Sequence, residues 1–268
     1  MLQNAETWLR LTKTDLKQLE TSDEILLRKL LDAPSKSPIP SLYLEFGVQP
    51  IRFILKSKRV MYLHYLLRRD PEEMIAKVFQ AQMDKPAKGD WCLVVMEDLN
   101  TLGLGHLTLD DIKSKTKSQM KLIVKKASKK AALDYLLQKK ENLSKMSNLN
   151  YSTLELQAYL SSDQVNLRLK RFAFKIRTRM IQVGHNFGRK ITCQVCQIPG
   201  TEDSQKHALF ECCTIQNLIN PTGMGADQVD PVKYEDIFTG EVGKINRVVK
   251  QCDSVFRKRL EIMENKSM

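Results

Sequence analysis

Apolar residues recur along most of this chain at intervals of three and four positions, the spacing that places them on one face of an α-helix. A helix is predicted from Ile51 to Leu66, because Pro50 suits a helix start and apolar side chains alternate with basic ones behind it. Another is predicted from about Gly243 to Asn265, where apolar residues again share one side. We therefore expect a mainly α fold of bundle-like helical segments that ends in an amphipathic C-terminal helix.

Start and stop signals place further helices. Residues 21–24 (Thr-Ser-Asp-Glu) predict a capping box that opens a helix ending before Pro34. Residues 70–73 (Asp-Pro-Glu-Glu) predict an N-cap and an acidic first turn for a helix that continues through Gln82. The apolar, β-branched stretch 91–96 is compatible with either a helix or a strand, because its period alone does not separate the two.

The segment from residue 165 to residue 183 carries two neighbouring stripes when it is drawn as a helix with about 100° per residue. The apolar stripe comprises Leu169, Phe172, Ile176, Met180 and Val183. The basic stripe beside it comprises Arg168, Arg171, Lys175 and Arg179. One face is thus expected to lie in the core, which would position a row of four cations to meet successive phosphates.

Charge adds to this picture, because the formal net charge of +12 is concentrated in two blocks. Residues 113–145 contain eleven lysines against Asp134 and Glu141, and residues 164–190 contain eight Lys or Arg and no acid. Such blocks attract polyanions, nucleic acid above all, although a solvated helix face gives the same pattern. The candidate nucleic-acid contacts are Arg168, Arg171, Lys175, Arg177, Arg179, Arg189 and Lys190.

Asp110 and Asp111 follow Thr108 and predict the acidic first turn of the lysine-rich helix. A catalytic pair of carboxylates is not expected here, because no third acid lies nearby in the sequence.

The most specific chemistry lies in four cysteine and histidine residues with the spacing C-x2-C-x10-H-x4-C, namely Cys193, Cys196, His207 and Cys212. Two cysteines two residues apart can turn both sulfur atoms toward one ion, and the polar loop after them can return the chain with the other two ligands. Four such ligands predict a closed, structural Zn²⁺ site in a small zinc knuckle. Cys213 could replace Cys212 as the fourth ligand, and Cys252 is expected in the core.

Cysteine use and the N-terminal sequence bear on the compartment. Six cysteines with four of them bunched suit a reducing compartment and a metal site better than a disulfide framework. The N-terminal twenty residues are amphipathic and carry acids, unlike a secretory signal or a transit peptide. The sequence contains no run of 18 apolar residues, so no membrane span is predicted. A nuclear or cytoplasmic protein that is not secreted is expected.

As an ordered series, several segments resemble the C-terminal region of reverse transcriptases from non-LTR retrotransposons. They are SDEILLRKLLDAP, SLYLEFGVQPIRFILKSKRVMYLHYLLRRD, KGDWCLVVMEDLNTLGL, RFAFKIRTRM with the following CQVC and HALFEC, and KYEDIF. The resemblance implies a thumb-like helical region over residues 1–88 and a basic helical linker over 89–190. It also implies a Cys-Cys-His-Cys knuckle over 191–219, followed by a linker and C-terminal helix over 220–268, and it favours a helix at Trp91–Leu102.

The same resemblance implies a grip on RNA or DNA through phosphates, and the polymerase part of the same element as a partner. The sequence departs from the family in ways that argue against catalysis. It lacks the Tyr-x-Asp-Asp turn of the polymerase palm. The nuclease signature that some relatives carry is absent too, since Asp230-Pro231 has the reversed order and Glu241 precedes Lys244 by three residues. The spacer before His207 is also longer than the family's usual one.

Three interpretations therefore remain open. The first is a non-catalytic nucleic-acid-binding fragment with a structural zinc site. The second is a protein-interaction module, and the third is a thumb-like subunit that acts with a separately encoded polymerase. Salt dependence separates the first two, because phosphate contacts weaken steeply with ionic strength and an apolar interface does not.

Overall fold

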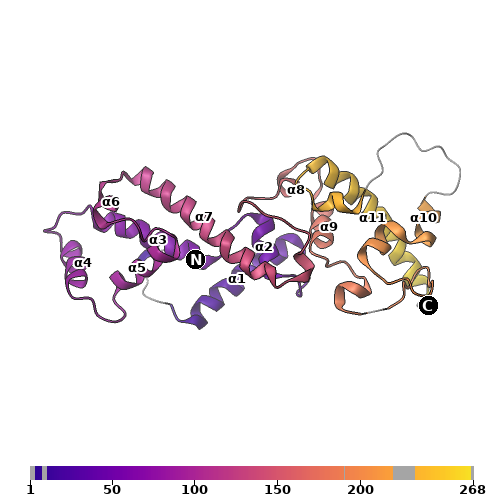
Figure 1. The fold of residues 1–268 in the computed structure, drawn as a ribbon, viewed down its shortest axis with the longest axis horizontal. Helices are drawn as coiled ribbons and strands as arrows, with labels where there is room; N and C mark the ends of the chain where they lie inside the picture. The colour runs from indigo at the N-terminus through magenta and orange to yellow at the C-terminus, as the bar shows by residue number, and fades with distance from the viewer. Residues whose placement is uncertain (1–3, 8–10, 190, 220–232, 267–268) are drawn as a thin grey trace. The chain divides into compact units, whose positions relative to one another are not determined.

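The structure is a computed structural model that describes residues 4–7, 11–189, 191–219 and 233–266. Over these residues it is mainly α, as predicted, with eleven α-helices, several short 3₁₀ turns, one π-helical turn and no strand (Figure 1). The α-helices are α1 (Lys13–Leu31), α2 (Ile39–Phe46), α3 (Ile51–Leu66), α4 (Met74–Asp84), α5 (Trp91–Thr101), α6 (Leu109–Ser114), α7 (Lys117–Glu141), α8 (Ala158–Ser161), α9 (Leu167–Arg177), α10 (Cys213–Ile219) and α11 (Val242–Asn265).

The chain forms two units that are each discontinuous in sequence. Unit 1 comprises Met1–Leu27, Gly47–Lys139 and Tyr151–Glu155, and unit 2 comprises Arg28–Phe46, Lys140–Asn150 and Leu156–Met268. The four segments proposed from the sequence, with boundaries at 88, 190 and 219, follow the chain in order and do not coincide with these spatial units. The division into these four segments stays a prediction.

Helix α3 is central to unit 1, where it packs against the 3₁₀ turn η1 (Ala5–Thr7) and against α5. Its apolar side contributes Phe53, Val60 and Leu63 to the core. Buried Asp98 of α5 accepts hydrogen bonds from Lys56 and Arg59 of α3, so its charge is compensated inside the unit. The start of α3 at Ile51, directly after Pro50, is as predicted.

The predicted capping box at residues 21–24 is wrong. Helix α1 begins eight residues earlier, where the Asp15 amide donates to the Thr12 hydroxyl and the Asp15 carboxylate accepts from the Thr12 amide. Thr21 and Ser22 lie inside the helix, and their hydroxyls donate to the carbonyls of Lys17 and Gln18 one turn earlier. Both hydroxyls are therefore satisfied locally, an alternative to capping that these residue types allow.

Two other helices also start at positions that differ from the prediction, because the capping residues close a separate turn or a shorter helix. The Asp70 side chain accepts from the Glu72 amide in a separate turn, and α4 starts only at Met74. Thr108 and Asp111 do form a capping box, but it opens the short helix α6 rather than the lysine-rich α7. The ambiguous stretch at Trp91 is helical, as the resemblance favoured.

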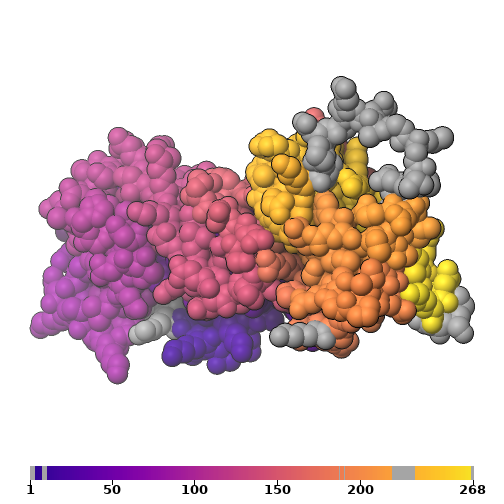
Figure 2. Space-filling view, turned by 45° about the vertical axis from the view of Figure 1, so that its right-hand side comes forward, coloured from indigo at the N-terminus to yellow at the C-terminus, as the bar shows by residue number. Residues whose placement is uncertain are grey.

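Unit 2 is held by one apolar core, to which α9 and α11 contribute the largest apolar faces. Leu169, Ala173 and Ile176 of α9 and Ile245, Val249 and Cys252 of α11 share this core, so each helix buries an apolar face as predicted, although Phe172 of the predicted stripe is only partly buried. The sulfur-bearing residues Cys193 and Cys212 belong to the same core. In the space-filling view the segment that carries them, in orange, packs directly against the yellow C-terminal helix (Figure 2).

Within the described ranges, no helix combines the length and the apolar character that crossing a bilayer requires. The linker expected at residues 220–225 and the Asp230-Pro231 pair lie outside the described residues.

Candidate metal centre

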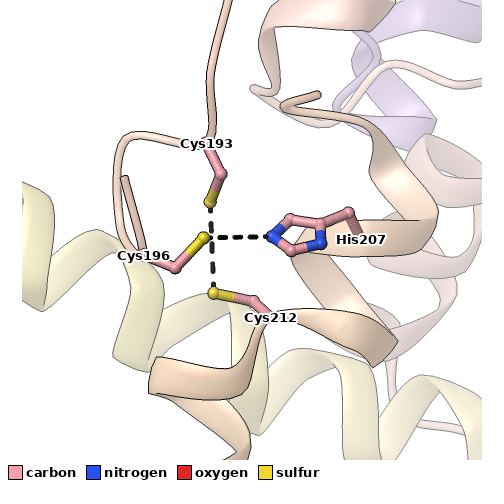
Figure 3. Close-up of side chains that lie close together, drawn as sticks. All are labelled: Cys193, Cys196, His207 and Cys212. Atoms are coloured by element: carbon pink, nitrogen blue, oxygen red, sulfur yellow. Dashed lines mark hydrogen bonds between the residues drawn. The ribbon is translucent and has the colours of Figure 1, made fainter. Parts of the chain in front are cut away.

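Cys193, Cys196, His207 and Cys212 come together in unit 2 and can hold a metal ion. Their ligand atoms all lie within 4.8 Å of one another. Figure 3 shows the four side chains pointing toward a common centre, two from a loop and two from the ends of one helical turn. Cys193, His207 and Cys212 are buried and Cys196 is partly buried, so the centre is closed by protein.

The donor spacing fits a tetrahedral ion. With metal–sulfur bonds of about 2.3 Å and metal–nitrogen bonds of about 2.0–2.1 Å, two sulfurs should lie about 3.8 Å apart and a sulfur and a nitrogen about 3.6 Å apart. The Sγ atoms of Cys193 and Cys212 are 4.0 Å apart, and Cys196 Sγ lies 3.5 Å from His207 Nε2. These two distances are close to the tetrahedral values, and all the ligand atoms lie within 4.8 Å of one another.

A tight loop presents the first two ligands. The Gln197 amide donates to the Cys193 carbonyl across 2.9 Å, and Gln197 itself has a left-handed φ of 55°. Gly200 at φ 82° then reverses the chain, and the Cys193 amide donates to the Thr201 carbonyl. Glycine suits such a φ because it has no Cβ. Backbone hydrogen bonds thus shape the Cys-x2-Cys loop, while Cys193 and Val195 anchor it in the core of unit 2.

A π-helical turn presents the other two ligands. His207 begins the π-helix η4 (His207–Glu211), and the Cys212 amide donates to the His207 carbonyl across 2.8 Å. In an ordinary α-helix, residues five apart would point about 140° away from each other. The wider turn brings them to one side, which explains how a spacing of H-x4-C can serve one ion.

The surroundings of the four side chains shift the pKa values of three of them, Cys193, Cys212 and His207. Burial raises the pKa of Cys193, but hydrogen bonds from the amides of Cys196 and Val195 and from Arg259 outweigh it, and the net pKa is lowered. Burial and the neighbouring thiols raise the pKa of Cys212 to about 12. Burial lowers the pKa of His207, which keeps its imidazole neutral and able to donate a lone pair.

Arg259 and Asp203 support the ligands from behind, and no sequence pattern predicts either role. Arg259 of α11 is fully buried; its Nη1 donates to Cys193 Sγ across 3.6 Å and its Nη2 to Asp203 Oδ1 across 2.6 Å. The other Asp203 oxygen accepts from the Gly184 amide at 2.7 Å. Outer contacts of this kind orient metal ligands. The contact of Arg259 could not be foreseen, because this residue lies far beyond Cys212 in the sequence.

Cys213, Cys252 and His185 all lie outside the centre. Cys213 is exposed at the start of α10, so Cys212 is the member of the pair that joins the cluster. Cys252 is buried in the core, as predicted, and burial raises its pKa to about 12. His185 lies in the turn η3 (Gly184–Phe187), and its ring nitrogen is 3.6 Å from Glu202.

The predicted row of cations is only partly formed. Arg168, Arg171 and Lys175 lie on α9, but the helix ends at Arg177, and Arg179 follows it with a left-handed φ of 52°. Arg168 pairs with Asp253 and Lys175 pairs with Asp32, each at 2.7–2.8 Å. Arg171 donates to the Leu30 carbonyl and Arg179 to the Ser144 carbonyl. Arg189 is exposed, and Lys190 lies outside the described residues.

The prediction that Arg177 contacts phosphates is wrong, because only 3% of its side chain is exposed. Its guanidinium donates to the carboxylate of Glu45, which is also buried, and to the carbonyls of Ile237 and Thr239. It also lies over the ring of Tyr159, whose hydroxyl donates to Glu45. Arg177 is therefore a structural residue of unit 2.

Comparisons of the chain with protein-family models, with curated proteins and with solved structures found no match.

Proposed function

We propose that the metal centre holds one Zn²⁺ ion in a structural role. Three thiols and an imidazole are soft and borderline donors, which suit Zn²⁺ and do not suit Mg²⁺ or Ca²⁺. The four side chains would fill all four tetrahedral positions of the ion, so none would be left for water or substrate. Zn²⁺ would supply charge compensation for the thiolates and cross-link the loop, the π-helical turn and the core of unit 2.

We further propose that the chain is a non-catalytic, nucleic-acid-binding module, similar in organisation to the C-terminal region of non-LTR retrotransposon reverse transcriptases. The observation that carries this proposal is that the Cys₃His centre and the basic helix α9 contribute residues to one apolar core. A net charge of +12 supports a polyanionic partner. We place the protein in the nucleus or cytoplasm, where thiol ligands stay reduced.

The salt dependence of binding tests this proposal. If Arg168, Arg171, Lys175 and Arg179 each contact a phosphate of a duplex, the logarithm of the binding constant should fall with the logarithm of salt concentration with a slope of roughly −3 to −4. Each replacement by alanine should flatten the slope by about one unit and weaken binding to all sequences alike. Lys258→Ala on α11, where Lys258 pairs with Glu261, removes the same charge elsewhere in unit 2 and is the control. A quadruple variant that binds like wild type at 150 mM salt would refute the contacts.

No polymerase or nuclease activity is expected from the chain alone in Mg²⁺ or Mn²⁺. Two-metal phosphoryl transfer needs clustered carboxylates, and the described residues contain no such group besides the cysteine and histidine centre. Asp111 is engaged in the cap of α6 through Thr108. Primer-extension and DNA-cleavage assays check this. Activity that disappears in an Asp110→Asn/Asp111→Asn variant would contradict it.

One observation favours the protein-interaction alternative. Helix α4 exposes three apolar side chains, Met74, Ile75 and Val78, of which Met74 is 77% exposed. Exposed apolar patches often mark contacts with other proteins, and a polymerase subunit is one such partner. Binding that persists at high salt would point to this face rather than to phosphate contacts.

A further inference from the structure

Unit 1 contains a groove between α3 and α7 that neither the metal centre nor α9 explains. Its volume is about 460 Å³, the size of a small ligand site. Residues of α3 form one wall and residues of α7 form the other, and both helices are labelled in Figure 1. The groove differs from a plain surface furrow in that aromatic rings line one wall and lysines line the other.

The aromatic wall is a preformed stack. The rings of Tyr62 and Tyr65 are 5.7 Å apart and nearly parallel, at 15°. Tyr62 is supported from behind by the edge of buried Trp91 at 5.5 Å, while Tyr65 is 45% exposed. The guanidinium of Arg69, which does not line the groove, lies 5.1 Å from the Tyr65 ring. Flat groups of this kind are the surfaces on which unpaired bases stack.

The opposite wall carries a regular row of cations. Lys117, Lys121 and Lys125 of α7 follow one another at intervals of four residues, about 6 Å along the helix axis, and all three are exposed. Lys58 of α3 adds a fourth cation. The acidic residue among the described lining residues is Glu6, which lies 3.9 Å from Lys58. The groove is thus strongly cationic along its α7 side.

We propose that this groove binds single-stranded nucleic acid, with bases stacked against Tyr65 and Tyr62 and the backbone phosphates on the α7 lysines. This inference rests on the proposed nucleic-acid-binding function. It adds that the ligand is single-stranded and that the groove is a second binding site besides α9. Duplex bases are already stacked on one another and present phosphates alone, so they would not use the tyrosine wall. An acidic peptide would use the same lysines, but a parallel ring stack offers it no particular advantage.

Two sets of variants of the full chain test the proposal. Tyr65→Leu removes the exposed ring and keeps an apolar side chain, whereas Tyr65→Trp keeps a stacking surface. Lys121→Gln/Lys125→Gln removes two groove cations. Lys126→Gln/Lys130→Gln removes two exposed cations of the same helix that do not line the groove. Fluorescence anisotropy with a labelled single-stranded oligonucleotide, and with a hairpin duplex of the same charge, reports binding, and circular dichroism confirms folding.

We expect Tyr65→Leu to weaken binding of the single strand by at least about fivefold and to leave duplex binding unchanged, since a stacked base contributes about 1–3 kcal/mol. Tyr65→Trp should bind the single strand like wild type. The groove lysine pair should lose more affinity for the single strand than the control pair. Equal losses for the two lysine pairs, or an unchanged Tyr65→Leu variant, would overturn the groove while the proposed function stands.

Two other outcomes would overturn more than the role of single residues in the groove. If the wild-type chain binds neither oligonucleotide, both the groove assignment and the nucleic-acid-binding function fail. If a labelled peptide of alternating glutamate and leucine depends on Tyr65 and the groove lysines while the oligonucleotide does not, the occupant is protein and the assignment is overturned.

Discussion

Replacing Cys196 with serine is expected to abolish binding of the proposed Zn²⁺ and to loosen most of unit 2. Zinc binding is worth about 10–16 kcal/mol in small zinc-dependent domains, as much as or more than the net stability of a typical domain. Cys193 and Cys212 lie in the same apolar core as α9 and α11, so losing the ion should affect those helices as well as the ligand loop. Elemental analysis should find one zinc per wild-type chain and none per variant. Hydrogen exchange should show lost protection across unit 2.

Cys213→Ser is the matched control for this experiment. Cys213 is the same residue type, one position from a ligand, and it is exposed outside the cluster. It should retain the ion and full protection. A wild-type protein that contains no zinc in reducing buffer and takes up none on titration would disprove the metal assignment.

Zinc affinity should also rise with pH. The Cys212 thiol has a pKa of about 12 without an ion, so binding Zn²⁺ at neutral pH displaces its proton. Acidification restores that proton and therefore favours release. Titration of zinc against a chelator between pH 6 and pH 8 should show this trend, and an affinity independent of pH would contradict thiolate ligation.

The second large effect is expected at Glu45. Glu45→Ala would leave the guanidinium of Arg177 buried without its carboxylate and the Tyr159 hydroxyl without its acceptor. Breaking a buried pair in this way typically costs about 3–5 kcal/mol. The midpoint of thermal or urea unfolding should fall accordingly, and hydrogen exchange should show that the loss of stability lies in unit 2.

Glu261→Ala provides the comparison within the same unit. Glu261 pairs with Lys258 on the exposed face of α11, and its loss should cost less than about 1 kcal/mol. The double variant Glu45→Leu/Arg177→Met should be more stable than Glu45→Ala, because it removes the uncompensated charge, but less stable than wild type, because the Ile237 carbonyl and the Tyr159 hydroxyl lose these hydrogen bonds. If Glu45→Ala and Glu261→Ala shift unfolding equally, Arg177 does not depend on Glu45.

Local patterns gave the helices and the metal ligands, while tertiary contacts decided the rest. The apolar periods of α3 and α11 and the cysteine and histidine spacing each carry their information within about twenty residues, so they could be recognised directly. Arg177 and Arg179 belonged to the same basic block in the sequence, yet one is buried and the other lies past the helix end. The buried charge of Arg177 is compensated by Glu45, 132 residues earlier, and no periodic pattern encodes that partner.

The misplaced start of α1 has a similar origin. Thr-Ser-Asp-Glu can cap a helix or continue one, and the choice depends on whether the preceding residues are already helical. The discontinuous units could not be inferred from composition either, because α2 enters unit 2 through its contacts with residues beyond 156.

The π-helical turn between His207 and Cys212 bears on how insertions and deletions act on this kind of centre. Removing one residue inside the turn would let it close as an ordinary α-helical turn, in which positions four apart already share a face. The pair can thus be separated by three or four residues without losing its common direction, whereas a further insertion would turn one ligand away. A search for equivalent centres should therefore allow both spacings after the histidine, and should treat the length of that gap as a poor measure of kinship.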